Sequence, residues 1–539
     1  MSEPNKSDGN WSSSSTTQPE PPVSTTGQAS AGDQGEGSGM TQEDSQAAGK
    51  KRKKSKAKHE GPESEGGTDT ASDNQQLQNL IASNPTLKKH FAGLEPEKME
   101  EALRKLKLEE ILSGMSPPSA KRQKDMAGYK FWKTQPVPAF DDQRPTEEGP
   151  IKMIEIDRVS KKPAPLIDGF EWVTMNLDDP AELSEVYELL SHHYVEDDEA
   201  MFRFNYSPAF FTWALKAPGW TKDWHIGVRA TKSRKLVAFI SGIPIGLRVR
   251  KTVLKSSEIN FLCIHKKLRS NRLAPVLIKE VTRRCYQIGT FQAIYTVGHI
   301  LPTPVSTCRY YHRCLDWEKL YEVGFSPLPS GSTVQRQIIR YKLPTTTSTP
   351  GLRPMKSKDV PAVQSLLKRY LDRFELAQEF TEEEVEHWLV HHEDSGREQV
   401  VWAYVVEEEN THRITDFFSF YNLESTVIGH KKHNAVRAAY SFYYASEKAL
   451  TGNMAELKVR LNELMKDALI LAKNAKFDVF NALSLLDNPL FLDDQKFGMG
   501  DGRLHYYLYN YRAAPIQGGL DAQQNASEKH MGGIGVVML

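Results

Sequence analysis

EINFLCIHKKLRSNRLAPVLIKEVTRR, residues 258–284, is the stretch that decides the fold. Residues 259–264 are apolar and β-prone, which predicts a short buried strand. A polar loop follows, and a helix is expected from about Leu273, with Pro275 suited to its first turn. The stretch therefore predicts a strand–loop–helix unit of an α/β fold. The apolar residues of the helix recur every four positions and form one face: Leu273, Leu277, Val281 and Cys285.

The loop between this strand and this helix is strongly basic. A helix N-terminus presents free N–H groups and the positive end of the helix dipole, and loop cations add to both, so the arrangement favours a phosphate group. Neither GxxxxGK followed by Ser or Thr nor GxGxxG occurs here, which disfavours a nucleoside triphosphate or a dinucleotide. A solvated basic turn is the alternative. The cationic side chains are Lys266, Lys267, Arg269, Arg272 and, when protonated, His265.

The composition fits a large soluble core. Of 539 residues, 39% are hydrophobic and 9% aromatic, and 69 Lys and Arg balance 69 Asp and Glu. The four cysteines form no CxxC pair, so a reduced cytosolic setting is expected. No apolar run approaches the roughly 20 residues that span a bilayer. The first residues lack the pattern of a signal peptide. We expect a cytoplasmic protein, in part associated with ribosomes or membranes.

Residues 1–125 differ from the rest of the chain. The first 75 are rich in Ser, Gly, Gln and Pro and carry almost no large apolar side chains, which predicts disorder. Within them, KKRKKSKAK at residues 50–58 carries seven positive charges. This cluster suits docking to an anionic surface such as a ribosome; a solvated run or a nuclear-localisation patch is the alternative. Residues 73–114 contain patterns of short amphipathic helices.

The globular body follows, in which strand-like and helix-like patterns alternate. This alternation predicts an α/β (α+β) fold with twisted mixed sheets. Two segments, residues 174–190 and 354–370, match at a spacing of 180, which predicts two related halves, residues 126–345 and 346–539; a chance match is the alternative. Strands are expected at 235–249, 258–264, 292–298, 403–409, 414–423 and 477–483, and helices at 274–289 and 455–475.

A family resemblance covers residues 129–539. The segments that carry it are EINFLCIHKKLRSNRLAP, YKFWKTQPVP, YVEDDEAMFRFNYSP, YTVGHILPTPVSTCRYYHR, GLRPM, KFDVFNAL, KFGMGDGRLHYYLYN and GIGVVML. In this order they closely resemble the glycylpeptide N-tetradecanoyltransferase (N-myristoyltransferase) family. The resemblance implies two pseudo-symmetric acyltransferase halves of the GNAT type. It also implies a monomer with no permanent cofactor and no metal.

By the same resemblance, the first half binds myristoyl-CoA as a co-substrate and the second half provides most of a peptide groove. The reaction moves the C14 acyl group from the thioester to the α-amine of an N-terminal glycine of peptides and nascent proteins. The backbone N–H groups of Phe261 and Leu262 would form an oxyanion hole, and Asn260 and Thr282 would help proton movement and the departure of the thiolate. The implied CoA-binding residues are Lys130, Phe131, Trp132, Phe261, Leu262, Cys263, Ile264, Ser270, Arg272, Leu273 and Ala274.

The resemblance assigns the catalytic base to the carboxylate of Leu539, the last residue. An α-ammonium must lose its proton before it attacks, and burial would raise the pKa of a terminal carboxylate in the direction that a base needs. No covalent acyl-enzyme is implied, so Cys263 is interpreted as a small buried hydrophobe. His265 and His312 are interpreted as structural or binding residues rather than bases.

The implied peptide groove contains acids that would meet a lysine downstream of the glycine. Asp197, Glu199 and Asp501 are the candidates; Glu199 replaces a common Asp and Lys130 replaces a common Gln, which leaves the peptide preference and one CoA contact open. The other groove residues are Tyr194, Phe202, Tyr206, Thr296, Gly298, Tyr310, His312, Phe325, Ser425, Tyr440, Asn481.

The closing GGIGVVML, residues 532–539, is apolar and is expected to enter the core, with its glycines allowing close packing. Residues 512–531 are expected to loop out so that Leu539 can reach the active site. Two other functions stay open at this point: a GNAT-like acyltransferase with another acyl chain or amine acceptor, and a non-catalytic acyl-CoA-binding or ribosome-docking protein.

Overall fold

A computed structural model describes residues 129–140, 142, 147–195, 201–393 and 396–539. The predicted N-terminal region, with its basic cluster and short helices, lies outside these residues. Fifteen strands of the described chain belong to one mixed sheet. The first seven are β1 (Phe170–Thr174), β2 (Phe202–Asn205), β3 (His225–Ala230), β4 (Leu236–Val249), β5 (Thr252–Ile264), β6 (Gln292–Val297) and β7 (Ser306–Cys314). The others are β8 (Leu352–Pro354), β9 (Leu376–Gln378), β10 (Val401–Glu407), β11 (Ile414–Val427), β12 (Ala435–Ser446), β13 (Val479–Leu483), β14 (Gly498–Tyr509) and β15 (Ile534–Gly535).

Helices cover this sheet. The α-helices are α5 (Pro180–His193), α6 (Pro208–Leu215), α7 (Leu273–Gln287), α8 (Trp317–Glu322), α9 (Val334–Tyr341), α10 (Val360–Leu371), α11 (Glu382–Leu389) and α12 (Met454–Asn474). Short 3-10 turns include η3 (Trp132–Thr134), η6 (Lys266–Asn271) and η9 (Glu447–Leu450). The predicted α/β class is confirmed. Each of the eight elements expected from sequence periodicity is present; most ends differ by up to four residues, and β5 begins six residues earlier than expected.

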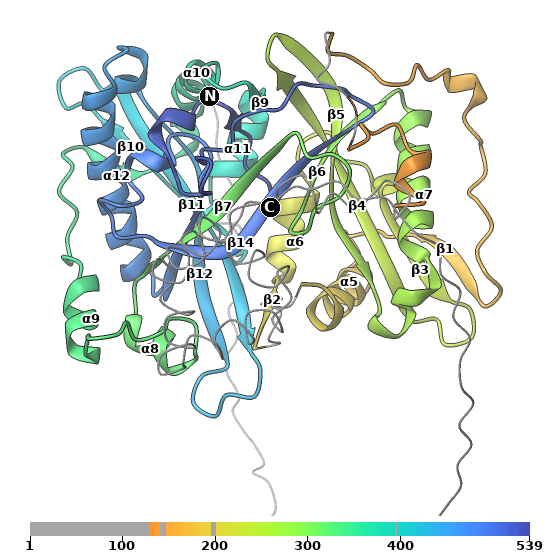
Figure 1. Ribbon diagram of the computed structural model, residues 1–539, viewed down its shortest axis with the longest axis horizontal. Coiled ribbons are helices and arrows are strands. Elements are labelled where there is room, and N and C mark those ends of the chain that lie inside the picture. Colours follow the sequence, from red (N-terminus) through yellow and green to blue (C-terminus); the bar gives the residue numbers. More distant parts are fainter. Residues whose placement is uncertain (1–128, 141, 143–146, 196–200, 394–395) are drawn as a thin grey trace, which may run out of the picture. The chain divides into compact units, whose positions relative to one another are not determined.

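The chain repeats its topology. In the first half the order is β1-β3-β4-β5-β6, and in the second half it is β8-β10-β11-β12-β13. In each series the last two strands pair in parallel and the others are antiparallel. The halves also exchange strands, because β14 pairs with β6 and β7 pairs with β13. Figure 1 shows the halves side by side, with β7 and β14 adjacent between them.

The matched segments at a spacing of 180 residues fall at equivalent places. Met175 and Met355 directly follow β1 and β8 and are both buried. Asp179 and Asp359 directly precede α5 and α10, each of which carries a proline in its first turn. The predicted internal repeat is therefore confirmed at the level of topology.

The predicted apolar face of α7 packs into the core. Leu273, Leu277, Val281 and Cys285 are at most 4% exposed, and they lie against β3 and β4 residues such as Ile226 and Ala238. The basic loop before α7 forms the 3-10 turn η6 rather than an irregular loop. This turn connects the end of β5 to the start of α7 and fixes their relative positions.

The chain's last residues are buried, as predicted. Ile534, Val536 and Met538 are at most 3% exposed, and β15 pairs in parallel with β9. A Cβ on Gly533 would lie 1.9 Å from the carbonyl oxygen of Gln517, so this close approach requires glycine. The tail is thus a fixed part of the core.

Residues 512–531 differ from the expectation. They do not loop out, but pack on the protein. Ile516 and Leu520 are buried, and the Ala526 N–H donates to the Tyr311 hydroxyl at 2.7 Å. Gly519 has a φ of +76°, and a Cβ there would lie 1.8 Å from the Ser484 carbonyl oxygen. Glycines allow this segment to lie against the backbone, which its polar composition does not reveal.

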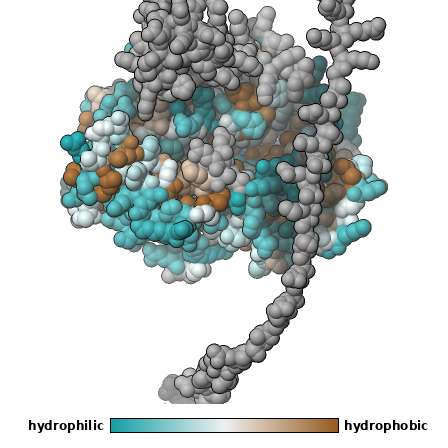
Figure 2. Space-filling model, turned by 60° about the horizontal axis from the view of Figure 1, so that its bottom comes forward, coloured by the Kyte–Doolittle hydropathy of each residue, from teal (hydrophilic) through white to brown (hydrophobic). Residues whose placement is uncertain are grey.

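All four cysteines are free and buried. No helix in the described part of the chain is long and apolar enough to cross a bilayer. Figure 2 shows small hydrophobic patches on a face that is mostly hydrophilic.

Candidate active site

A β-bulge interrupts the pairing of β4 with β5. Asn260 lies opposite Ser241 and Cys263 lies opposite Phe239, so Phe261 and Leu262 together face Ile240. Phe261 has a φ of +56°, which is uncommon for a bulky residue and costs free energy. A bulge leaves an extra residue outside the hydrogen-bonded ladder. The bulge therefore takes backbone groups of this segment out of the regular ladder with β4, and the Phe261 backbone hydrogen-bonds the Tyr194 hydroxyl.

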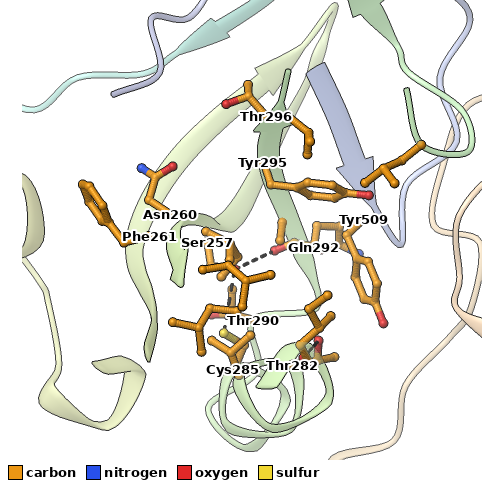
Figure 3. Close-up of a pocket in the computed structure, with 18 of the residues that line it drawn as sticks. Ser257, Asn260, Phe261, Thr282, Cys285, Thr290, Gln292, Tyr295, Thr296 and Tyr509 are labelled. Carbon is orange, nitrogen blue, oxygen red and sulfur yellow. Dashed lines mark hydrogen bonds between the residues drawn. The ribbon is translucent and has the colours of Figure 1, made fainter. Parts of the chain in front are cut away.

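A cavity opens where β5 and β6 separate. Their parallel pairing covers only Ser256–Glu258 and Gln292–Ile294, although both strands continue. Beyond this point lies a cavity with about 900 Å³ of empty space, open solvent at its mouth included. Figure 3 shows its walls, formed by β5, β6 and one side of α7. The bulge thus lies at the edge of an enclosed space.

The cavity brings together residues that the sequence predicts for the site. The five predicted catalytic residues, and three more from the CoA and peptide predictions, are among its lining residues: Asn260, Phe261, Leu262, Thr282, Leu539, Trp132, Tyr194 and Thr296. Most of the other lining residues are apolar or aromatic, among them Ile240, Ile259, Ile278, Val281, Phe291 and Leu301. Such walls suit a long apolar group with a polar reacting end.

Aromatic rings form one wall of this cavity. The ring of Trp132 stacks on Tyr295 at 5.7 Å between centroids, and Tyr295 stacks on Tyr507 at 5.0 Å. Lys130 and Phe131 do not line the cavity; Lys130 is exposed, and the Phe131 ring contacts that of Trp132. Only Trp132 of the three predicted neighbours therefore reaches the enclosed space.

Four other predicted CoA residues are packed differently. Cys263, Ile264 and Leu273 are buried in the core, and Ala274 packs against it, so their side chains do not line the cavity. The side chain of Ser270 lies outside the described residues.

The N-terminus of α7 is open. Arg272, in the left-handed region with a φ of +55°, occupies the N-cap position, and no side chain among the described residues caps this helix end. Its first turn contains no acid. Lys266, Lys267 and Arg272 are exposed around it. Unused helix N–H groups with cations nearby suit an anion, so the features on which the phosphate prediction rests are present at this helix end.

Two other members of the basic loop hold it together. Arg269 donates to the carbonyl oxygens of Ile264 and His193, so it fastens η6 to the body. His265 caps η6, because its Nδ1 accepts from the Lys267 N–H at 3.3 Å. The His193 and His265 rings are 4.0 Å apart, and burial, with the charges of neighbouring His265 and lysines, lowers the pKa of His193 to about 4. These contacts agree with a structural interpretation of His265.

The thiols near the cavity are protonated at neutral pH. Burial raises the pKa of Cys263 to about 12, and its Sγ lies 3.8 Å from the Leu189 carbonyl oxygen. Burial also raises the pKa of Cys285 to about 12, and its thiol donates to the Ser257 hydroxyl at 3.7 Å (Figure 3). A thiolate is the reactive form of cysteine, so these residues fit the interpretation of Cys263 as a buried hydrophobe.

Buried tyrosines fix the approach of the chain's end to the cavity. The Val537 N–H donates to the Tyr443 hydroxyl at 3.0 Å, and the Tyr506 hydroxyl donates to the Val536 carbonyl oxygen at 3.2 Å. The Gly533 carbonyl oxygen accepts from the Leu376 N–H at 2.9 Å. Leu539 is half-buried and lines the cavity. The terminal residue is therefore held in the same space as the bulge.

Thr282 lies on the cavity side of α7 (Figure 3). Its hydroxyl donates to the Ile278 carbonyl oxygen one turn earlier, at 2.7 Å. Because the hydroxyl proton of Thr282 is used in this bond within the helix, its oxygen can mainly accept hydrogen bonds from other groups.

A second cavity lies beside β12 and β13, with about 1040 Å³ of empty space, open solvent included. His312 Nδ1 lies 2.7 Å from Asn481 Oδ1, and burial lowers the pKa of His312 while the charge of Asp501 opposes this. Seven residues predicted for a peptide groove line it: Phe202, Tyr310, His312, Phe325, Ser425, Tyr440 and Asn481.

The remaining predicted groove residues are distributed around the two cavities. Tyr206 is buried, and its ring lies 5.3 Å from that of Phe261 and 5.8 Å from that of Tyr194. Asp501 is exposed in an irregular stretch of β14 opposite β7. Gly298 follows β6 and lines neither cavity. Asp197 and Glu199 lie outside the described residues.

Sequence reasoning missed one acid of the site. Glu258 is 6% exposed and accepts from Asn260 Nδ2 at 2.6 Å. Burial raises the pKa of Glu258 to about 7, against the opposing effect of the Asn260 hydrogen bond. The available signal was an acid within an otherwise apolar strand pattern, two residues before a predicted catalytic asparagine.

Comparison with known proteins agrees with this geometry. Residues 150–308 match the family model "Myristoyl-CoA:protein N-myristoyltransferase, N-terminal domain", and residues 322–537 match the C-terminal domain of the same family. The glycylpeptide N-tetradecanoyltransferase of Aspergillus fumigatus is 63% identical over 465 residues, which cover 86% of this chain and 94% of the relative. That of Saccharomyces cerevisiae is 50% identical over 452 residues, 82% of this chain and 98% of the relative.

A solved structure is also similar. Saccharomyces cerevisiae N-myristoyltransferase with bound myristoyl-CoA has a TM-score of 0.73 and 51% sequence identity, and the match covers 76% of this chain and 94% of that one. Fold, site and relatives together define an acyltransferase. The chain belongs to the N-myristoyltransferase family.

Proposed function

We propose that this protein transfers the C14 acyl group of myristoyl-CoA to the α-amine of an N-terminal glycine. One observation carries the proposal: the chain's own terminal residue, Leu539, lines the same cavity as the bulged segment Phe261–Leu262. A candidate proton acceptor and candidate oxyanion donors therefore share one apolar space. The relatives named above carry the corresponding activity in their names.

The open N-terminus of α7 would bind the phosphates of the acyl-CoA. Arg272, Leu273 and Ala274 form this helix start, with Ser270 completing the predicted set. The acyl chain would extend into the apolar cavity, past Trp132 and along α7. The uncapped helix end thus suits the phosphates of the ligand, and the apolar walls suit its acyl chain.

In the proposed reaction the neutral glycine amine attacks the thioester carbonyl. Its proton passes to the carboxylate of Leu539, and the N–C bond forms while negative charge develops on the carbonyl oxygen. The N–H groups of Phe261 and Leu262 would stabilise this charge. Collapse breaks the C–S bond, and the departing CoA thiolate takes up a proton. Asn260 and Thr282 line the cavity where the amine and the thiolate would pass.

The second cavity would hold the residues that follow the glycine. Its lining includes aromatic side chains and the His312–Asn481 pair, and Asp501 lies close enough to act on the pKa of His312. Asp501, with Asp197 and Glu199, would attract a lysine of the peptide. The basic cluster at residues 50–58 as a ribosome-docking arm and the cytoplasmic location remain predictions.

The decisive experiment mixes the protein with myristoyl-CoA and a peptide that begins with Gly-Asn. We expect release of free CoA and a product whose mass increases by one myristoyl group at its N-terminus. A peptide that begins with Ala-Asn is the matched control and should give no product. Absence of acylation on the glycine peptide would refute the proposal.

A series of acyl-CoA chain lengths tests the alternative acyltransferase. If C12 or C16 acyl-CoA gives a higher kcat/KM than the C14 compound, the protein is an acyltransferase with another acyl donor. Equal rates on the glycine and alanine peptides would identify a general amine acyltransferase.

A further inference from the structure

Glu258 differs from the other buried carboxylates of the described chain. Most of those have a cationic partner, as in the pairs Glu280–Arg284, Asp359–Arg353, Asp416–Arg460, Asp478–Lys319 and Asp487–Arg373. Asp467 accepts instead from the backbone N–H groups of Ser348 and Thr349. Within the described residues Glu258 has no ion pair, and its side-chain hydrogen bond is the one from Asn260. Burying an ionised acid without a cationic partner costs free energy, which suggests that Glu258 has a function.

The bond to Glu258 determines how Asn260 presents its amide. A carboxamide has one donor end and one acceptor end, and Asn260 Nδ2 donates to Glu258 Oε1 at 2.6 Å. This leaves Oδ1 of Asn260, which lines the cavity, as an acceptor for another group. In Figure 3 the Asn260 nitrogen is turned away from Tyr295 and Thr296, and the oxygen lies on their side. An ionised Glu258 offers no donor, so it excludes the flipped orientation.

Residues from four strands surround Glu258. Ile243 of β4 and Ile294 of β6 lie opposite it in the sheet. Tyr421 of β11 and Tyr443 of β12 are the titratable groups that face it from the second half. Tyr443 also accepts the Val537 N–H of the tail. Glu258 is therefore enclosed between the bulge and the elements that hold Leu539.

We propose that Glu258 is a positioning residue that holds the Asn260 carboxamide with Oδ1 toward the cavity, where it accepts a hydrogen bond from the acceptor amine of the peptide. The role rests on the proposed function, because the amine is its ligand. Ionised Glu258 fixes this orientation. Protonated Glu258 carries its own donor and permits both orientations, so the benefit is lost at low pH.

A double-mutant cycle tests the route through Asn260. E258M removes the acceptor, and we expect it to lower kcat/KM for the peptide roughly 10-fold, the effect of losing a hydrogen bond to a charged group, with the KM for myristoyl-CoA unchanged. In an N260L background, E258M should have no further effect, because the amide that it positions is gone. An equal loss in both backgrounds would overturn the proposal.

E258Q tests the role of charge without changing shape. Glutamine offers a donor and an acceptor at all pH values, so the variant mimics the protonated acid. The ratio of kcat/KM between the unchanged protein and E258Q should be close to one at pH 5.5 and rise through about pH 7 to a plateau. Titration of the peptide amine cancels in this ratio. A ratio that does not depend on pH would overturn the proposal.

A second measurement does not depend on turnover. The side-chain amide protons of Asn260, assigned by their loss in N260L, should shift with an inflection near pH 7 in the unchanged protein and show no inflection in E258Q. Absence of the inflection in the unchanged protein would refute the proposed pairing, whether or not the enzyme transfers myristate. Absence of transfer together with a normal inflection would instead refute the proposed function.

Discussion

The two halves of this protein share one topology, but they treat equivalent helix ends differently. In the first half, α7 follows η6, lacks a cap among the described side chains and is surrounded by cations. In the second half, α12 follows η9, and its N-terminus is capped by Asn453, whose Oδ1 accepts from the N–H groups of Ala455 and Glu456. Glu456 adds a negative charge in the first turn. One helix end keeps free N–H groups that would suit an anion, and the other is closed by the protein's own side chains.

The same contrast holds for the bulges. Asn260–Cys263 against β4 corresponds to Ser441–Tyr444 against β11, where the register also shifts by one residue. In the first half Phe261 adopts a positive φ, whereas Phe442 and Tyr443 do not. Tyr443, in the place of Leu262, instead holds the tail. The same bulged position therefore carries the cavity-lining segment Phe261–Leu262 in one half and a tyrosine that holds the chain's last residues in the other.

The largest expected effect comes from moving the end of the chain. Adding residues after Leu539 removes its carboxylate, and we expect kcat to fall about 100-fold or more, the typical contribution of a general base. L539A keeps a carboxylate at the same position and should lose far less. Mass spectrometry of the acylated peptide measures both. Full turnover by the extended chain would show that the tail serves only packing.

The next effect concerns the open helix end. R272N removes a cation, and R272D reverses it; asparagine and aspartate both tolerate the left-handed conformation at this position. We expect the KM for myristoyl-CoA to rise roughly 10- to 100-fold, more for R272D, from the loss of charge-assisted hydrogen bonds.

The matched control for this effect is N453A at the end of α12. Loss of this cap should cost about 1 kcal/mol of stability and leave the KM for myristoyl-CoA unchanged. If both substitutions alter that KM equally, the contrast between the two helix ends has no bearing on the ligand.

A third effect concerns Glu258, whose counterpart two residues before Ser441 is the buried Ala439. The folded-state pKa of Glu258, about 7, is above the unfolded value. The free energy of unfolding therefore decreases as the pH rises from 5 to 8. E258Q should match the unchanged protein at pH 4.5 and be more stable at pH 8, by at most about 3 kcal/mol. Denaturant unfolding at both pH values measures the difference, and equal stability at pH 8 would contradict the assigned titration.

The smallest effect concerns the hydroxyl that holds the tail. Y443F removes the acceptor of the Val537 N–H, and we expect a loss of about 1 kcal/mol of stability and a few-fold decrease in kcat. Y444F removes a buried hydroxyl that donates to Asn488 at 2.7 Å and accepts from the Asp487 N–H at 3.1 Å, and neither of these bonds is made to the tail. It should cost similar stability but leave kcat unchanged. Equal kcat values for the two variants would show that Tyr443 does not position the chain's end.

Local sequence pattern is enough to predict an element whose buried face is set by its own periodicity. The four-residue repeat from Leu273 to Cys285 predicts α7 and its buried side because both depend on the helix alone. Glu280 lies on this side too, at 2% exposure, and the signal for its burial is the pair of arginines at positions 283 and 284 that bind it. Periodicity alone misses such a satisfied charge.

The bulge and the tail depend on partners far away in the chain. The shift at Phe261 exists only relative to β4, and no pattern within β5 encodes it. Residues 512–531 look like a polar loop, because their packing is made by glycine contacts with Thr307 and Ser484. The predicted roles of Leu539 and Asn260 came from family resemblance, and the structure adds that both residues line one cavity.

The exchange of β7 and β14 between the halves has a consequence for biosynthesis. The partner of β6 is β14, which leaves the ribosome roughly 200 residues later. At about 5–20 residues per second, the edge of β6 waits roughly 10–40 seconds for its neighbour. During this interval a strand edge destined for the middle of the sheet is open to other chains. The first half of this protein therefore matures only after β14, a strand of the second half, has been translated.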